Sequence, residues 1–237
     1  LSYITRTKTY SRRNETTFSL IEASIKKLSQ SFDPSSFKAP FISLEEIRKK
    51  ADEFRAIYCR DKTLPVDILN IVEFCLKLEL LPVQRLKSFA DIDALLLGDN
   101  KTIVVDEEEF MDDRMQNRIR FSLAHEVGHF VLHRDIYTKF SYSSIDDWIE
   151  LVQNIPEEQY SFLEMHANEF AGRLLVPKDE LEKSVAMLSD KIEKAKNFGI
   201  DDESLIRKHI APLICKKFEV SAEVISIRLE IEKIRML

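Results

Sequence analysis

Residues 114–133 read RMQNRIRFSLAHEVGHFVLH, and the rest of the expected fold is built around this segment. It contains no proline, and its apolar side chains recur at helical spacing, which predicts an α-helix. The stripe that this helix would bury consists of Leu123, Val127 and Val131. His125 and His129 lie about 40° apart around the helix and one turn apart along it, so both imidazoles project from one face.

His125, Glu126 and His129 form the motif HExxH within this helix. Two imidazoles at this spacing can occupy adjacent corners of a zinc tetrahedron. Glu126 points about 100° away from His125, beside the metal, where its carboxylate can accept a proton from an attacking water. The motif therefore predicts a metal centre with Glu126 as its general base, against the simpler interpretation of two surface histidines without a metal.

A catalytic zinc usually has three protein ligands and one open position. The candidates for the third ligand are His133 and, on a second helix predicted over residues 160–177, Glu164, His166 and Glu169. Ligands in three successive turns of one helix would span about 12 Å, so His133 is expected beside the ligands or on the surface. The three candidates of the second helix lie on different faces, and their spacing does not choose among them.

The segments RFSLAHEVGHFVLH (120–133) and EMHANEFAGRLLVP (164–177) together resemble the ImmA/IrrE family of zinc metallopeptidases, with similarity extending over about residues 41–230. The resemblance implies one zinc per chain, held by His125, His129 and Glu164. It implies that Asn168 orients a ligand imidazole by a hydrogen bond, a role that His133 could share. Val176 and Gly172 depart from the usual family residues without touching this chemistry.

The expected fold class is α+β. It comprises a zincin-like, gluzincin-type catalytic domain over residues 41–180, with a small antiparallel sheet and the HExxH helix. A basic extension at 1–40, expected to be partly flexible, precedes it, and a helical, helix-turn-helix-like domain at 181–237 follows it. The segments DALLLG (93–98) and TIVVDE (102–107) predict a β-hairpin, and LLPVQRL (80–86) predicts a third strand.

Local signals place the remaining elements. Ser43 and Glu46 form a capping box, which predicts a helix that begins there. Pro65 suits the first turn of another helix. Residues 134–159 are expected to be a polar surface connector with one short helix near Ile145 to Val152. Since this connector lies between the two metal helices, it could also gate or line the substrate groove, although a surface loop is the simpler expectation. Ser221 is expected to cap the second helix of the C-terminal helix-turn-helix outline.

Composition excludes several classes of protein. The chain has 35 Lys+Arg against 41 Asp+Glu, a net charge of −6, which disfavours direct nucleic-acid binding. Residues 181–237 are nearly neutral and lack the cationic excess that phosphate contacts need. Three scattered cysteines exclude a disulfide scaffold and fit a reducing, cytoplasmic location. No stretch is apolar enough for a membrane span, and no signal peptide is evident.

Two functions are consistent with the sequence. The family resemblance implies an intracellular zinc endopeptidase that cleaves a helix-turn-helix repressor of the Xre type and so derepresses its target genes. The alternative is a non-enzymatic, metal-containing regulator or interaction module. Glu126 favours the peptidase, because a structural zinc has no use for a general base. The donor that stabilises the oxyanion is not identified; its candidates are Tyr137, Tyr142, Tyr160 and His133, while His166 and His209 are assigned no part in the chemistry.

Overall fold

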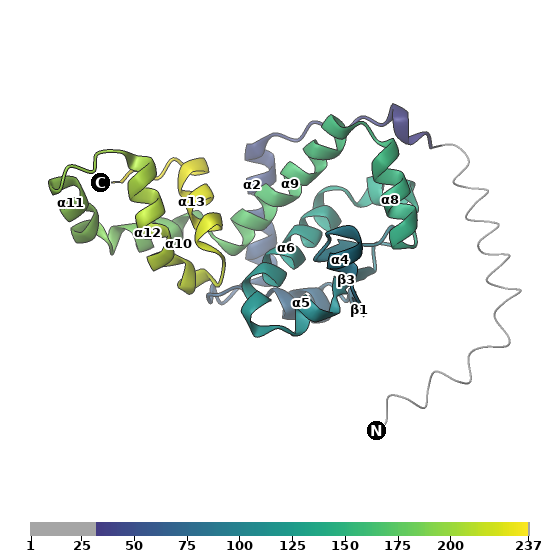
Figure 1. Cartoon of the computed structure of the whole chain (residues 1–237), viewed down its shortest axis with the longest axis horizontal. Helices are drawn as coiled ribbons and strands as arrows, with labels where there is room; N and C mark the ends of the chain where they lie inside the picture. The colour runs from purple at the N-terminus through teal and green to yellow at the C-terminus, as the bar shows by residue number, and fades with distance from the viewer. Residues whose placement is uncertain (1–31, 237) are drawn as a thin grey trace, which may run out of the picture.

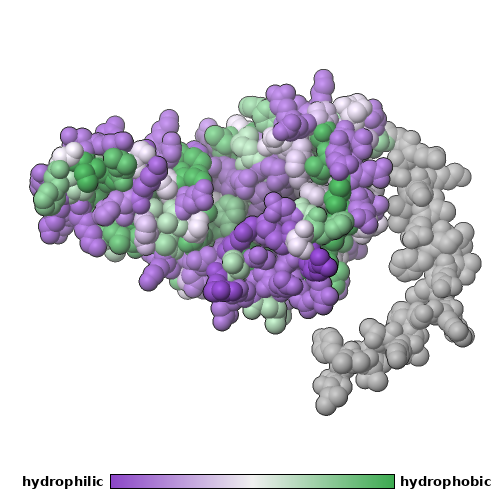
Figure 2. All heavy atoms as spheres, viewed as in Figure 1, coloured by the Kyte–Doolittle hydropathy of each residue, from purple (hydrophilic) through white to green (hydrophobic). Residues whose placement is uncertain are grey.

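The computed structural model describes residues 32–236, so most of the predicted basic extension lies outside the described residues. Helices α10–α13 gather at one end of the molecule, and α2, α6, α9 and the sheet form the larger part (Figure 1). The face in Figure 2 is mainly hydrophilic, with smaller hydrophobic patches. Between Phe32 and Met236, no helix combines the length and apolarity needed to cross a bilayer.

The described chain contains short helices, one three-stranded sheet and several long helices. In chain order these are a 3₁₀ helix (Pro34–Ser36), α2 (Leu44–Tyr58), α3 (Ile68–Asn70) continued by a π-helical turn (Ile71–Cys75), β1 (Glu79–Val83), α4 (Leu86–Ala90), β2 (Ala94–Leu96), β3 (Thr102–Asp106), α5 (Glu107–Met111), a 3₁₀ helix (Asp113–Met115), α6 (Gln116–Leu132), α7 (Arg134–Phe140), α8 (Ile145–Asn154), α9 (Glu157–Leu175), α10 (Lys178–Ala186), α11 (Ser189–Asn197), α12 (Glu203–Phe218) and α13 (Ala222–Ile231).

The sheet has the strand order β1-β3-β2. The predicted hairpin is confirmed, since β2 pairs antiparallel with β3. The expectation of an antiparallel sheet is wrong for β1, which runs parallel to β3. The chain leaves β1 through α4 and β2 before it enters β3, and such a crossover returns the chain in its original direction.

Two further expectations about local structure need correction. The helix expected to begin at Pro65 begins at Ile68, because the Asp67 side chain accepts a hydrogen bond from the Asn70 N–H and caps it there. The connector 134–159 contains α7 as well as the predicted helix near Ile145, now α8. The capping box at Ser43 is confirmed as the start of α2.

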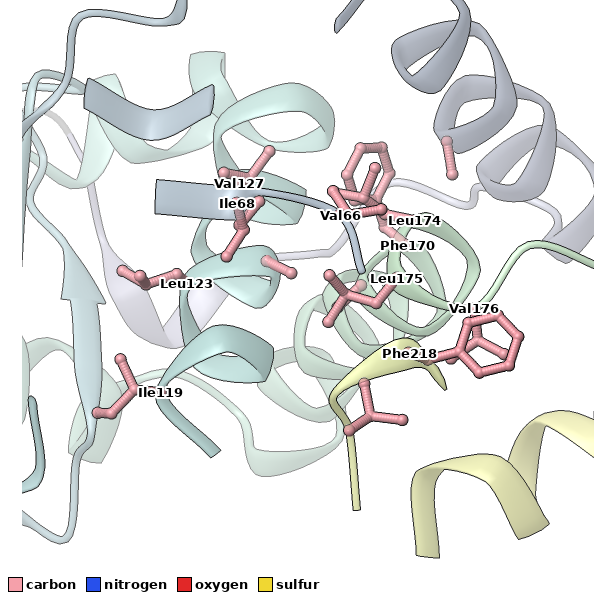
Figure 3. Close-up of a cluster of buried hydrophobic side chains, with 14 of the residues drawn as sticks. Val66, Ile68, Ile119, Leu123, Val127, Phe170, Leu174, Leu175, Val176 and Phe218 are labelled. Carbon is pink, nitrogen blue, oxygen red and sulfur yellow. The ribbon is translucent and has the colours of Figure 1, made fainter. Parts of the chain in front are cut away.

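The core centres on the crossing of α6 and α9. Leu123 and Val127 of the predicted stripe are fully buried there, while Val131, near the end of α6, is only half-buried. Figure 3 shows Leu123 and Val127 on the side of α6 near Ile68 of α3, while the buried Phe170 and Leu174 belong to α9. A Cβ at Gly128 would lie 3.0 Å from the Ala167 Cα, so the glycine lets the two helix backbones approach closely.

A buried ionic network joins α13 to α9. Arg228 is only 2% exposed and donates to the Glu169 carboxylate at 3.0 Å, to which Arg48 of α2 also donates at 2.6 Å. Arg228 pairs with Glu232 as well. A Cβ at Gly172 would lie 2.9 Å from the Arg228 Cδ, which explains why this chain has glycine at that position.

The predicted helix-turn-helix outline is present in α12 and α13. Glu219 takes the left-handed conformation between them, with φ of 50°. The Ser221 side chain accepts a hydrogen bond from the Val224 N–H and caps α13, as predicted. The boundaries of the domains at 41–180 and 181–237 stay predictions.

Candidate metal centre

Three side chains from α6 and α9 converge at one point. The Nε2 atoms of His125 and His129 are 2.9 Å apart, and they lie 3.2 and 3.3 Å from the two carboxylate oxygens of Glu164. Tetrahedral bonds of about 2.0–2.1 Å separate two ligand atoms by about 3.3 Å. The two imidazole nitrogens and the carboxylate of Glu164 therefore form a donor triangle of about the size that a zinc-sized cation requires, and they could hold a metal ion.

The side chain of Asn168 lies behind the first of these imidazoles. Its Oδ1 is 2.9 Å from Nδ1 of His125, and an amide oxygen only accepts, so that Nδ1 carries the proton. The other ring nitrogen is then free to face a metal. The structure thus gives Asn168 the contact that its predicted orienting role requires.

A buried row of imidazoles extends from His129. Nδ1 of His129 lies 3.0 Å from Nδ1 of His133, and Nε2 of His133 lies 3.2 Å from Nδ1 of His166. All three side chains are at most 2% exposed. Burial lowers the pKa of His129 to about 4 and the pKa of His133 to about 2, so both are neutral, the form that binds metals.

The contact of His166 with His133 was not predicted, because helical spacing places His166 on another face of α9 than Glu164. The structure brings it to His133, one turn beyond the ligands, rather than to the site itself. Only the crossing of α6 over α9 at Gly128 and Ala167 creates this contact, and no spacing within either helix signals it. His209 lies exposed on α12, and Glu169 belongs to the Arg228 network.

Replacing His133 by Phe should weaken metal binding by about 10–100-fold, because His129 would lose the partner that fixes its ring while the volume at position 133 is kept. The measurement is a competition titration of the metal against a chelator. His209→Phe is the matched control and should bind metal as the wild type does. Equal affinities in the two variants would show that His133 does not orient His129.

The electrostatics of the site favour a cation. Burial would raise the pKa of Glu164, but its hydrogen bonds with His125 and His129 hold it below its usual value. Burial would lower the pKa of His125, but Glu164 and the charge of Glu126 outweigh it and raise this pKa to about 9. Without a metal, a proton on His125 thus supplies the positive charge that the two carboxylates attract.

Glu126 is held beside the donor triangle and not within it. It is 5% exposed, and its Oε2 accepts a hydrogen bond of 2.7 Å from the Leu96 N–H of β2. Burial raises its pKa to about 7, although the charge of His125 and the Leu96 N–H act against this. A carboxylate with such a pKa is well matched to accept a proton near neutral pH.

A cleft of about 380 Å³ opens over these residues. Residues 90–95 form one wall of the cleft. Its other walls consist of residues of α6 and α9, together with Tyr137 and Trp148 from the segment 134–159. Parts of the connector therefore line the site, which is the less expected of its two roles. Tyr160 also lines the cleft, and burial together with the charge of Glu164 raises its pKa, so its hydroxyl stays protonated.

The candidates for the oxyanion donor differ in availability. The Tyr142 hydroxyl donates to the Leu96 carbonyl at 2.6 Å, and both nitrogens of His133 are occupied by other histidines. Tyr137 is buried against the His129 ring, with 5.0 Å between ring centroids. Tyr160, only partly buried by its neighbours in the cleft, is the strongest of the four candidates.

Within the range 32–236, no fourth histidine, cysteine, aspartate or glutamate joins the group of His125, His129 and Glu164. Structural zinc sites have four protein ligands, whereas catalytic sites keep one position open. The two imidazoles and one carboxylate could therefore hold a metal ion with three protein ligands.

A comparison with models of protein families matches residues 89–230 to the IrrE N-terminal-like domain, Peptidase_M78. The matched range contains both metal helices and extends to α13. Neither the curated proteins nor the solved structures gave a match.

Proposed function

The chain belongs to the Peptidase_M78 family of IrrE-like metallopeptidases, and on this premise we propose that it is an intracellular zinc endopeptidase that cleaves a helix-turn-helix repressor of the Xre type. The observation that carries the peptidase activity is the donor triangle with an open fourth position and Glu126 beside it. The ligand set of two imidazoles and one carboxylate without a thiolate is typical of catalytic zinc.

A zinc ion in this triangle would supply Lewis acidity toward the substrate carbonyl and the attacking water. Glu126 takes the proton of that water and delivers it to the leaving amine. The Leu96 N–H fixes the position of its carboxylate. Tyr160, which lines the cleft and keeps its hydroxyl proton, is the donor that we propose for the carbonyl oxygen as charge develops on it.

The outer edge of β2, on the side away from β3, can align the substrate. In the pairing of β2 with β3, Leu97 and Asp93 bond to β3, so by alternation Ala94 and Leu96 direct their backbone groups outward. The backbone N–H and C=O of Leu96 are already hydrogen-bonded to Glu126 and Tyr142, whereas Ala94 lines the cleft. An extended peptide that adds to this edge would pass directly in front of Glu126.

The repressor substrate is supported by the family resemblance and by the absence of a cationic excess in residues 181–237, which favours protein recognition over DNA binding by the C-terminal helices. The test is to incubate the zinc-loaded chain with an Xre-type repressor encoded beside its gene. We expect cleavage at one site, loss of cleavage with a chelator, and its return with zinc.

Two results would contradict parts of this proposal. If the repressor stays intact while the zinc-loaded chain hydrolyses other polypeptides, the substrate is wrong. If the zinc-loaded chain hydrolyses none of them, the chain is the non-enzymatic regulator of the alternative interpretation.

A further inference from the structure

A second hollow of about 480 Å³ lies between α9 and α13, and its walls are mainly apolar. Leu44 of α2, Met165 of α9 and Ile227 of α13 line it and are 45%, 39% and 47% exposed. Single exposed apolar side chains are common on proteins, but several around one hollow mark an interaction site. We call this hollow the α9–α13 groove; Phe121, Val224 and Ile231 complete its apolar lining.

The α9–α13 groove continues from the metal cleft. Phe121 and Asn168 line both hollows. Phe121 lies one turn before His125 on α6, and Asn168 lies one turn after Glu164 on α9. A polypeptide that occupies the cleft and continues past Asn168 therefore enters the groove.

The charges of the groove indicate what can occupy it. At its base, Glu169 and Arg228 neutralise each other in a buried pair of 3.0 Å. At its rim, Glu223 is exposed, and no cation among the described residues forms an ion pair with it. An occupant with apolar side chains and a neighbouring Lys or Arg would match both the lining and this carboxylate.

We propose that the α9–α13 groove binds an apolar stretch of the protein substrate, flanked by a basic residue and several residues away from the scissile bond. This inference rests on the proposed peptidase function. It gives α13 a role in substrate selection, because Val224, Ile227 and Ile231 form one wall of the groove.

The first test measures binding without cleavage. The probe is a short fluorescent peptide of leucines and lysines, titrated by anisotropy against zinc-loaded full chain that carries Glu126→Gln. Adding Ile227→Glu should weaken binding by at least about tenfold. Leu213→Glu is the matched control, since Leu213 is also 47% exposed but lies on α12 outside the groove; it should change binding little. A peptide of leucines and glutamates should bind more weakly than the probe.

The second test measures cleavage of the Xre-type repressor and of a short peptide that spans only its cleavage site. In the chain with an intact Glu126, Ile227→Glu should raise KM for the repressor by about tenfold or more and leave the short peptide unaffected. Cleavage that responds equally to Ile227→Glu and Leu213→Glu would overturn the groove inference and leave the peptidase function standing. If Ile227→Glu weakens binding of the probe but the chain with intact Glu126 hydrolyses neither substrate, the peptidase function is contradicted and the groove inference is not.

Other occupants give different results in the same experiments. If deletion of residues 1–31 strengthens probe binding severalfold, the chain's own N-terminal segment occupies the groove. If light scattering shows a dimer that Ile227→Glu dissociates, a second copy occupies it. Either result would overturn the assignment to the substrate.

Discussion

Glu126→Gln is expected to lower the rate of cleavage by about 10²–10⁴-fold while the chain keeps its metal. Glutamine has the shape of glutamate, and its amide oxygen can still accept the hydrogen bond from the Leu96 N–H. It cannot take a proton from water at neutral pH, so the step that Glu126 performs is lost. The metal stays, because Glu126 does not belong to the donor triangle.

The loss of activity in this variant is not expected to come from unfolding. Burial raises the pKa of Glu126 to about 7, which means that its charged form is disfavoured in the folded chain. A neutral side chain of the same size should therefore not lower the free energy of unfolding. The measurements are kcat, zinc content and a urea unfolding curve, with exposed Glu158→Gln on α9 as the control. Full activity in Glu126→Gln would show that Glu126 is not the general base.

Glu164→Ala is expected to remove most of the bound metal. Glu164 supplies the only anionic donor of the triangle, and two imidazoles without it leave the metal with half of a tetrahedral ligand set. The loss of affinity should exceed the roughly 10–100-fold that accompanies loss of an outer hydrogen bond. Zinc content after dialysis against a weak chelator measures it, and activity should return only at high zinc concentration.

Glu169→Gln is the matched control on the same helix. Its carboxylate pairs with Arg48 and Arg228 rather than with the histidines. The variant should keep its zinc and lose about 1–3 kcal/mol of unfolding free energy, because buried charge-assisted hydrogen bonds are weakened. If Glu169→Gln lost zinc while Glu164→Ala kept it, the assignment of the third ligand would be wrong.

Helix α6 could be predicted from the sequence. The histidines of HExxH and the apolar Leu123 and Val127 are each spaced four residues apart, and they lie on opposite faces of one helix. Glu164 could not be chosen by spacing. The rotation of α9 depends on how closely it approaches α6, and the contact of Gly128 with Ala167 sets this. The family resemblance supplied that residue, and the structure places it at the donor triangle.

Other features depend on tertiary contacts that the sequence alone does not reveal. Strand propensity identified β1 but not its direction, which depends on the path through α4 and β2. The link from His133 to His166 depends on the helix crossing. The polar composition of residues 134–159 resembles a surface loop, yet Tyr137 and Trp148 turn toward the cleft once α7 and α8 form.

We expect His125, His129 and Glu164 to hold one catalytic zinc per chain. Anomalous X-ray diffraction at the zinc edge, from crystals of the zinc-loaded full chain, tests it most directly. We expect one strong peak per chain, about 2.0–2.2 Å from the two histidine Nε2 atoms and a Glu164 oxygen, with no fourth protein ligand. A peak elsewhere, or one with His133 or a cysteine as a fourth ligand, would contradict the claim.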